Sequence, residues 1–145
     1  MIFPRVTRHI DRVFIHCSAS DNKNHDDINV IEQWHLDRGF SGVGYHFFIK
    51  KDGTIQNGRE IDRTPAAQKG HNKGTIAICL GGLESFTQAQ FDSLIILCYS
   101  IAGTYDVTFH GHCEVSNKSC PVFDYKEVLG LDERGKLTKE PLPWN

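Results

Sequence analysis

Short apolar segments of strand type alternate along this chain with segments of helical periodicity, and this alternation most constrains the fold. Residues 12–16 ("RVFIH") and 75–80 ("TIAICL") are rich in β-branched side chains and are bounded by loops with turn-forming residues, as expected for buried strands. Residues 106–112 ("DVTFHGH") predict a further short strand. A hairpin is predicted from a strand at 45–50, an Asp-Gly turn and a return strand that starts near Thr54.

Two longer segments have the period of an amphipathic helix. In residues 28–39 ("INVIEQWHLDRG") the apolar side chains recur three or four positions apart, and the final glycine is a usual helix stop. In residues 86–103 ("FTQAQFDSLIILCYSIAG") Thr87 and Gln90 form a capping box ahead of an apolar stripe. Strands that alternate with helices predict an α/β fold, with a central mixed β-sheet flanked by α-helices.

The length and charge of the chain narrow both its organisation and its partners. With 145 residues, we assign 1–145 to a single domain with a core at about 10–130, and expect the polar tail, 131–145, to be mobile or loosely packed. A net charge of −2 provides no broad basic surface, which disfavours nucleic acid as a partner. No apolar run is long enough to span a membrane, and the N-terminus lacks a secretion signal, so we expect synthesis in the cytosol without export.

The cysteines do not suggest a disulfide framework. Their number is odd, no CxxC pair occurs, and we expect a cytosolic chain. Two of them, Cys79 and Cys98, lie inside apolar runs and are expected to act as small buried hydrophobic side chains. Three have polar neighbours and could take part in chemistry: Cys17, Cys113 and Cys120.

Histidines and cysteines concentrate in one segment, residues 109–124 ("FHGHCEVSNKSCPVFD"). His16 ends one predicted strand, His112 follows another, and Cys120 lies eight residues after His112. Strand ends meet at the rim of a sheet, where distant side chains can converge. Two histidines and one thiolate form a three-ligand zinc set that leaves a fourth position for water, as in catalytic zinc sites.

This pattern alone leaves alternatives open. A single histidine at a strand end is more often an ordinary packed residue, and the eight-residue spacing is not specific for zinc. His110 and Cys113 could also be ligands. A thiol nucleophile, Cys17 or Cys113, could pair with a histidine instead. We rank that reading below the metal site, because a nucleophile and its base usually meet across the fold rather than along the sequence.

Four ordered blocks together resemble a known family. They read "FIHCSAS", "IEQWHLDRGFSGVGYHFFIKKDGTIQNGR", "TIAICLGG" and "HCEVSNKSCPVFD". In this order they resemble the zinc-dependent N-acetylmuramoyl-L-alanine amidases, in particular the amidase-type phage lysozymes, which are related to the peptidoglycan recognition proteins. The resemblance runs from about Val13 to about Tyr125 and implies the fold of that family.

The resemblance also implies which residues form the site. The ligands of one catalytic zinc ion would be His16, His112 and Cys120. The active-site tyrosine would be Tyr45, and the catalytic lysine would be Lys118. His110 and Cys113, the two other candidates in the same segment, would then not be ligands.

Several neighbouring positions differ from the family or stay ambiguous. Ala67 and His71 stand where relatives often carry a histidine and a tyrosine. That segment lines the substrate groove in relatives, so we expect an altered substrate preference but unchanged zinc chemistry. Glu114 is a candidate for a carboxylate base, or only for a partner that orients a ligand histidine, and we do not assign it a catalytic role. His46 is expected to face away from the neighbouring tyrosine as a packed histidine, and Trp34 to belong to the core.

The function implied by the resemblance is hydrolysis of the amide between N-acetylmuramic acid and L-alanine in peptidoglycan. A phage or prophage endolysin would be made in the host cytoplasm and reach the wall once the membrane is permeabilised. A wall-directed toxin delivered between bacteria would use the same chemistry. Two other functions remain on the same fold: a protein that binds peptidoglycan without cutting it, and a regulator that binds the phage RNA polymerase. The complete set of five expected site residues disfavours the first, and no sequence motif supports the second.

Overall fold

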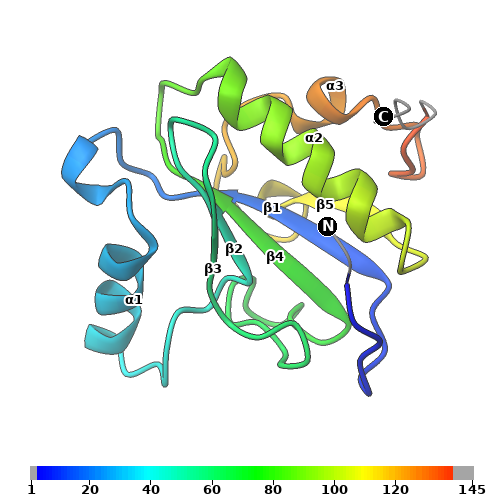
Figure 1. The fold of residues 1–145 in the computed structure, drawn as a ribbon, viewed down its shortest axis with the longest axis horizontal. Helices are drawn as coiled ribbons and strands as arrows, with labels where there is room; N and C mark the ends of the chain where they lie inside the picture. The colour runs from blue at the N-terminus through cyan, green and yellow to red at the C-terminus, as the bar shows by residue number, and fades with distance from the viewer. Residues whose placement is uncertain (1–2, 139–145) are drawn as a thin grey trace.

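The computed structural model describes residues 3–138, and in this part of the chain five strands form one mixed sheet (Figure 1). Their order is β3-β2-β4-β1-β5. β1 lies parallel to β4 and β5, β2 lies parallel to β4, and β3 is antiparallel to β2. The strands are β1 (Arg12–Cys17), β2 (Phe47–Ile49), β3 (Ile55–Asn57), β4 (Thr75–Leu80) and β5 (Thr108–Gly111).

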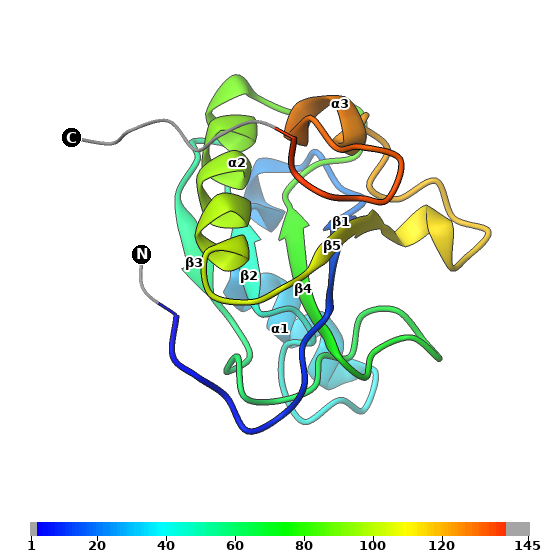
Figure 2. The same ribbon diagram turned by 90° about the vertical axis from the view of Figure 1, so that its right-hand side faces the viewer.

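Helices cover the two faces of this sheet unequally (Figures 1 and 2). α2 (Gln88–Ala102) and the short α3 (Tyr125–Leu129) lie on one face, and α1 (Ile28–Asp37) lies on the other. Two single 3₁₀ turns, η1 (Lys23–His25) and η2 (His112–Glu114), occur in connections. The predicted α/β architecture with a mixed sheet between helices is therefore confirmed.

The main core lies between the sheet and α2. Val13 and Ile15 of β1 point to this side together with alternate residues of β4, and all of them are buried. α2 contributes a buried stripe that includes Leu94 and Leu97. The predicted capping box is present, because the Thr87 side chain accepts the Gln90 N–H and the Gln90 side chain accepts the Thr87 N–H.

The second face is only partly covered by α1. Ile28 and Ile31 of this helix pack on Phe48 and Cys79, which belong to β2 and β4, with Trp34 partly buried beside them. On β1, His16 contacts the aromatic rings of neighbouring side chains instead of a helix. The sheet therefore leaves the carboxyl ends of β1 and β5 available for polar side chains.

The tail is better packed than its composition suggests. Leu131 and Leu137 form an antiparallel bridge and pack against the main core, and Gly135 O accepts a hydrogen bond of 2.8 Å from Phe109 N–H in β5. The expectation of a loose or mobile tail was therefore wrong for residues 131–138, while residues 139–145 lie outside the described part. No helix in the described part is both long and apolar enough to cross a membrane.

Candidate metal centre

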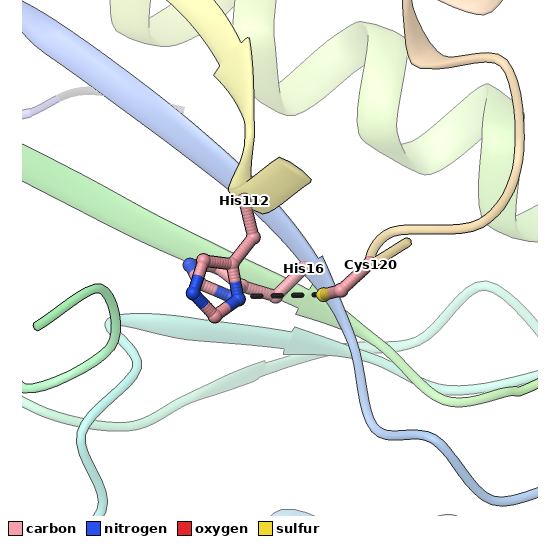
Figure 3. A group of neighbouring side chains, drawn as sticks. All are labelled: His16, His112 and Cys120. Carbon is pink, nitrogen blue, oxygen red and sulfur yellow. Dashed lines mark hydrogen bonds between the residues drawn. The ribbon is translucent and has the colours of Figure 1, made fainter. Parts of the chain in front are cut away.

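Two histidines are brought together by the register of the parallel strands. β1 pairs with β5 so that Ile15 lies opposite Gly111. The next residue along each segment, His16 in β1 and His112 at the start of η2, therefore lies at the same end of the sheet. Their ring centroids are 4.6 Å apart, and Figure 3 shows both rings side by side.

Cys120 reaches the same point from the loop that follows η2 (Figure 3). Its Sγ lies 3.9 Å from His16 Nδ1 and accepts a hydrogen bond of 3.1 Å from the Cys17 N–H. One ligand atom from each of His16, His112 and Cys120 lies within 4.8 Å of the others. In a tetrahedral zinc site, bonds of 2.0–2.3 Å separate neighbouring ligand atoms by about 3.3–3.8 Å. The three side chains therefore need only a small contraction to hold such an ion.

The ionisation of these groups suits a metal cation. Burial and the nearby His112 lower the pKa of His16 to about 3, and burial followed by the charge of Lys118 lowers the pKa of His112. Both imidazoles are therefore neutral at pH 7, which is the form that binds metal. The neighbouring Cys17 thiol and burial raise the pKa of Cys120. A nearby cation such as Zn²⁺ would stabilise the thiolate form of Cys120, which is the form that binds metal.

Tyr45 lies at the edge of this group. Its ring centroid is 5.2 Å from that of His16 and 5.4 Å from that of His35 in α1. The preceding residue is fixed, because Gly44 N–H donates a hydrogen bond of 2.8 Å to His35 Nδ1. Burial raises the pKa of Tyr45 well above its ordinary value, so the hydroxyl remains a hydrogen-bond donor at neutral pH.

Lys118 lies on the exposed loop that leads to Cys120. Its backbone N–H donates to Ser116 Oγ at 3.1 Å, which bends this loop. The positive charge of Lys118 contributes to the lowered pKa of both His16 and His112. The charge of Lys118 therefore acts on both candidate histidine ligands.

Comparison with known proteins identifies the family. Residues 6–123 match the family model described as N-acetylmuramoyl-L-alanine amidase. The chain belongs to the N-acetylmuramoyl-L-alanine amidase family. It is 38% identical over 125 residues to the endolysin of Escherichia phage T7, a match that covers 80% of this chain and 83% of the relative.

Solved structures agree with this assignment. The N-acetylmuramoyl-L-alanine amidase LysC from Clostridium intestinale URNW matches with a TM-score of 0.78 at 30% identity, over 85% of each chain. The complex of peptidoglycan recognition proteins LCa and LCx bound to tracheal cytotoxin shows the same fold, with a TM-score of 0.70 at 24% identity over 83% of this chain and 81% of that one. The expected enzyme class, an amidase that acts on peptidoglycan, is confirmed by the sequence family and these amidase relatives.

One residue that contacts the candidate metal group was missed from the sequence. Gln68 is fully buried, and its Oε1 lies 2.9 Å from His16 Nε2. Its Nε2 donates to Thr75 Oγ1 at 2.7 Å and to His71 O at 3.2 Å. Gln68 belongs to the segment that was expected only to line the substrate groove. No local sequence signal could have located it, because its contact with His16 joins positions 52 residues apart.

Glu114 does not orient a ligand histidine of the amidase, so that expectation was wrong. Its Oε1 lies 3.0 Å from His110 Nδ1, and its Oε2 accepts the Gly111 N–H at 2.9 Å and the Tyr125 hydroxyl. These bonds anchor the end of β5 to α3. Glu114 therefore fixes the backbone just before His112 rather than the imidazole itself.

The remaining candidates lie outside the metal group. The second nitrogen of His110 contacts Thr108 Oγ1 at 2.6 Å, and the Cys113 side chain is exposed. Cys17 is buried, and the neighbouring Cys120 thiol lowers its pKa. Among residues 3–138 neither Cys17 nor Cys113 has a hydrogen bond to a histidine, so the thiol–histidine pair of the alternative reading is not formed there.

Proposed function

We propose that this amidase holds one catalytic Zn²⁺ ion through His16 Nδ1, His112 and Cys120 Sγ. The observation that carries the proposal is the meeting of two neutral imidazoles and one thiol beyond the carboxyl ends of β1 and β5, with ligand atoms within 4.8 Å of one another. The donor set fits the ion, because two nitrogens and one sulfur leave a fourth position for water. When bound, Zn²⁺ supplies a water whose pKa falls from 15.7 toward about 7.

The bond that we assign to this site joins the lactyl group of N-acetylmuramic acid to L-alanine in peptidoglycan. Lys118 would place its positive charge beside the carbonyl oxygen, which becomes negative during attack by water. Tyr45 keeps its proton and would donate a hydrogen bond to the substrate or the water, and assist proton transfer to the leaving amine. The contact of the Tyr45 ring with the His16 ring and the influence of the Lys118 charge on His16 and His112 support these two roles.

For the biological role we infer an endolysin that degrades the host wall during phage or prophage release. The match to a phage endolysin over most of both chains supports this role. A protein that only binds peptidoglycan would not need the thiol ligand, the lysine and the tyrosine together. For the regulator alternative, binding of a phage RNA polymerase, no feature of residues 3–138 provides support.

The test is digestion of purified peptidoglycan, followed by mass spectrometry of the released fragments and by measurement of zinc per protein. We expect stem peptides with a free L-alanine amine, and we expect them to disappear with a chelator, to return with added zinc, and to be absent with Cys120→Ser. Cutting that survives both chelation and Cys120→Ser would refute the zinc mechanism. Bound zinc without any cutting would instead favour the binding protein.

A further inference from the structure

The side-chain amide of Gln68 has an orientation that its neighbours determine completely. Thr75 Oγ1 has a single proton, and it donates this proton to Asn72 O at 2.8 Å. The same oxygen must therefore accept at its contact of 2.7 Å with Gln68, and the carbonyl oxygen of His71 can only accept. The two N–H groups of Gln68 are thus directed at Thr75 and His71, and Gln68 Oε1 is left facing His16.

This orientation decides which nitrogen of His16 carries the proton. Gln68 Oε1 can only accept, so the contact of 2.9 Å requires an N–H on His16 Nε2. A neutral imidazole has one proton, so Nδ1 keeps its lone pair. Nδ1 is the nitrogen that lies 3.9 Å from Cys120 Sγ. The amide therefore selects the tautomer in which His16 presents a free lone pair to the candidate ligand group.

The frame behind the amide is rigid and excludes water. Asn72 Oδ1 accepts the backbone N–H groups of Ala67 and Gln68, both at 2.9 Å, and His71 N–H donates to Gln68 O at 2.8 Å. Gln68 and Thr75 have no solvent exposure. Water cannot compete for either end of the amide, so its direction is fixed by the protein alone.

We propose that Gln68 is a positioning residue of the metal centre, which holds His16 as the Nε2–H tautomer and thereby sets the affinity for zinc. This inference rests on the proposed zinc site and extends it to the segment 67–75. Partners of this kind typically change metal affinity 10–100-fold. A purely structural Gln68 would contribute to folding stability without any effect on tautomer or zinc affinity.

Two matched pairs of variants separate these roles. Gln68→Leu removes the acceptor, whereas Gln68→Asn keeps an amide on a shorter side chain. Thr75→Val removes the oxygen that directs the amide, so that the Gln68 group can turn its N–H toward His16, whereas Thr75→Ser keeps that oxygen. We expect zinc to bind about 10–100-fold more weakly to Gln68→Leu and Thr75→Val, with Thr75→Ser close to wild type and Gln68→Asn in between.

The measurements are zinc dissociation constants from competition with a chromogenic chelator, and the ¹⁵N shifts of the His16 ring in zinc-free protein. The wild type should show the Nε2–H tautomer, and Thr75→Val should show a mixture of both tautomers. An Nδ1–H tautomer in the wild type would overturn the inference even if every variant fails to fold. Wild-type zinc affinity in folded Gln68→Leu would overturn it while leaving the zinc site intact, whereas a wild type that binds no zinc would refute the proposed function itself.

Discussion

The surroundings of His16 and His46 show what distinguishes a candidate metal ligand from a packed histidine. Both side chains are 1% exposed, and burial lowers the pKa of His16 to about 3 and of His46 to about 4. Both nitrogens of His46 bond to main-chain groups: Nε2 donates to Arg63 O at 2.8 Å, and Nδ1 accepts the Ala77 N–H at 3.1 Å. His16 uses one nitrogen for Gln68 and directs the other at Cys120. Burial and pKa are therefore shared, and the partner of the second nitrogen makes the difference.

The strongest test of this comparison is the same substitution at both positions. His16→Asn should lose zinc and reduce activity to background, because the site then keeps only two protein ligands. His46→Asn should keep zinc and activity but lose about 1–3 kcal/mol of unfolding free energy, because it strands the Ala77 N–H or the Arg63 carbonyl in a buried place. Zinc content, release of stem peptides and urea denaturation measure the three quantities. Equal loss of zinc in both variants would break the distinction.

A second test compares the positive charges beside the two histidines. Lys118 acts on the pKa of His16, and Arg8, which donates to Ile61 O at 2.9 Å, acts on the pKa of His46. Lys118→Met should lower kcat about 10²–10³-fold, the usual effect of losing one group that stabilises an oxyanion, without loss of zinc. Arg8→Met should leave kcat unchanged and lower only stability. Steady-state kinetics on soluble muropeptides would decide, and an unchanged kcat in Lys118→Met would remove this residue from the mechanism.

Much of the fold could be predicted because its signals are local. The α2 helix follows from its capping box and apolar stripe, and the central strands follow from their β-branched runs. The tail was predicted wrongly because its polar composition concealed Leu131 and Leu137, which pair with each other and pack, partly buried, against the core. Patterns within a segment were thus readable, whereas a contact between two isolated apolar residues was not.

In the candidate site too, the sequence indicated local features but not the contacts between distant residues. His16, His112 and Cys120 were reached through family resemblance and strand ends, although the parallel register that joins the two histidines is not visible in either strand alone. The role of Gln68 could not be predicted, because the direction of its amide depends on one proton of Thr75. Hydrogen-bond direction is a property of the assembled network, so the choice of nitrogen on His16 appears only in three dimensions.

The pH dependence of the unfolding free energy tests whether His46 stays unprotonated in the folded protein. Its folded pKa of about 4 lies below the ordinary value of 6.5, so between these pH values the unfolded chain binds a proton that the folded chain does not. Stability should therefore fall as the pH drops from 6.5 to 4, by up to about 3 kcal/mol from this group. In the zinc-free Cys120→Ser background, adding His46→Gln should flatten this part of the urea-denaturation profile. An unchanged slope would show that His46 is protonated alike in both states.

The smallest effect is expected for Cys113→Ser, which we compare with Cys120→Ser. Cys113 lies seven residues before Cys120, and its backbone N–H donates to Cys120 O at 2.8 Å, but its side chain is exposed. Cys113→Ser keeps the backbone bond, so zinc content and activity should match wild type and stability should change by less than about 0.5 kcal/mol. Loss of cutting with zinc retained would make Cys113 a nucleophile and restore the thiol mechanism. If Cys113→Ser matches wild type while Cys120→Ser is inactive, zinc binding and activity require only the thiol of this loop that lies next to the free nitrogen of His16.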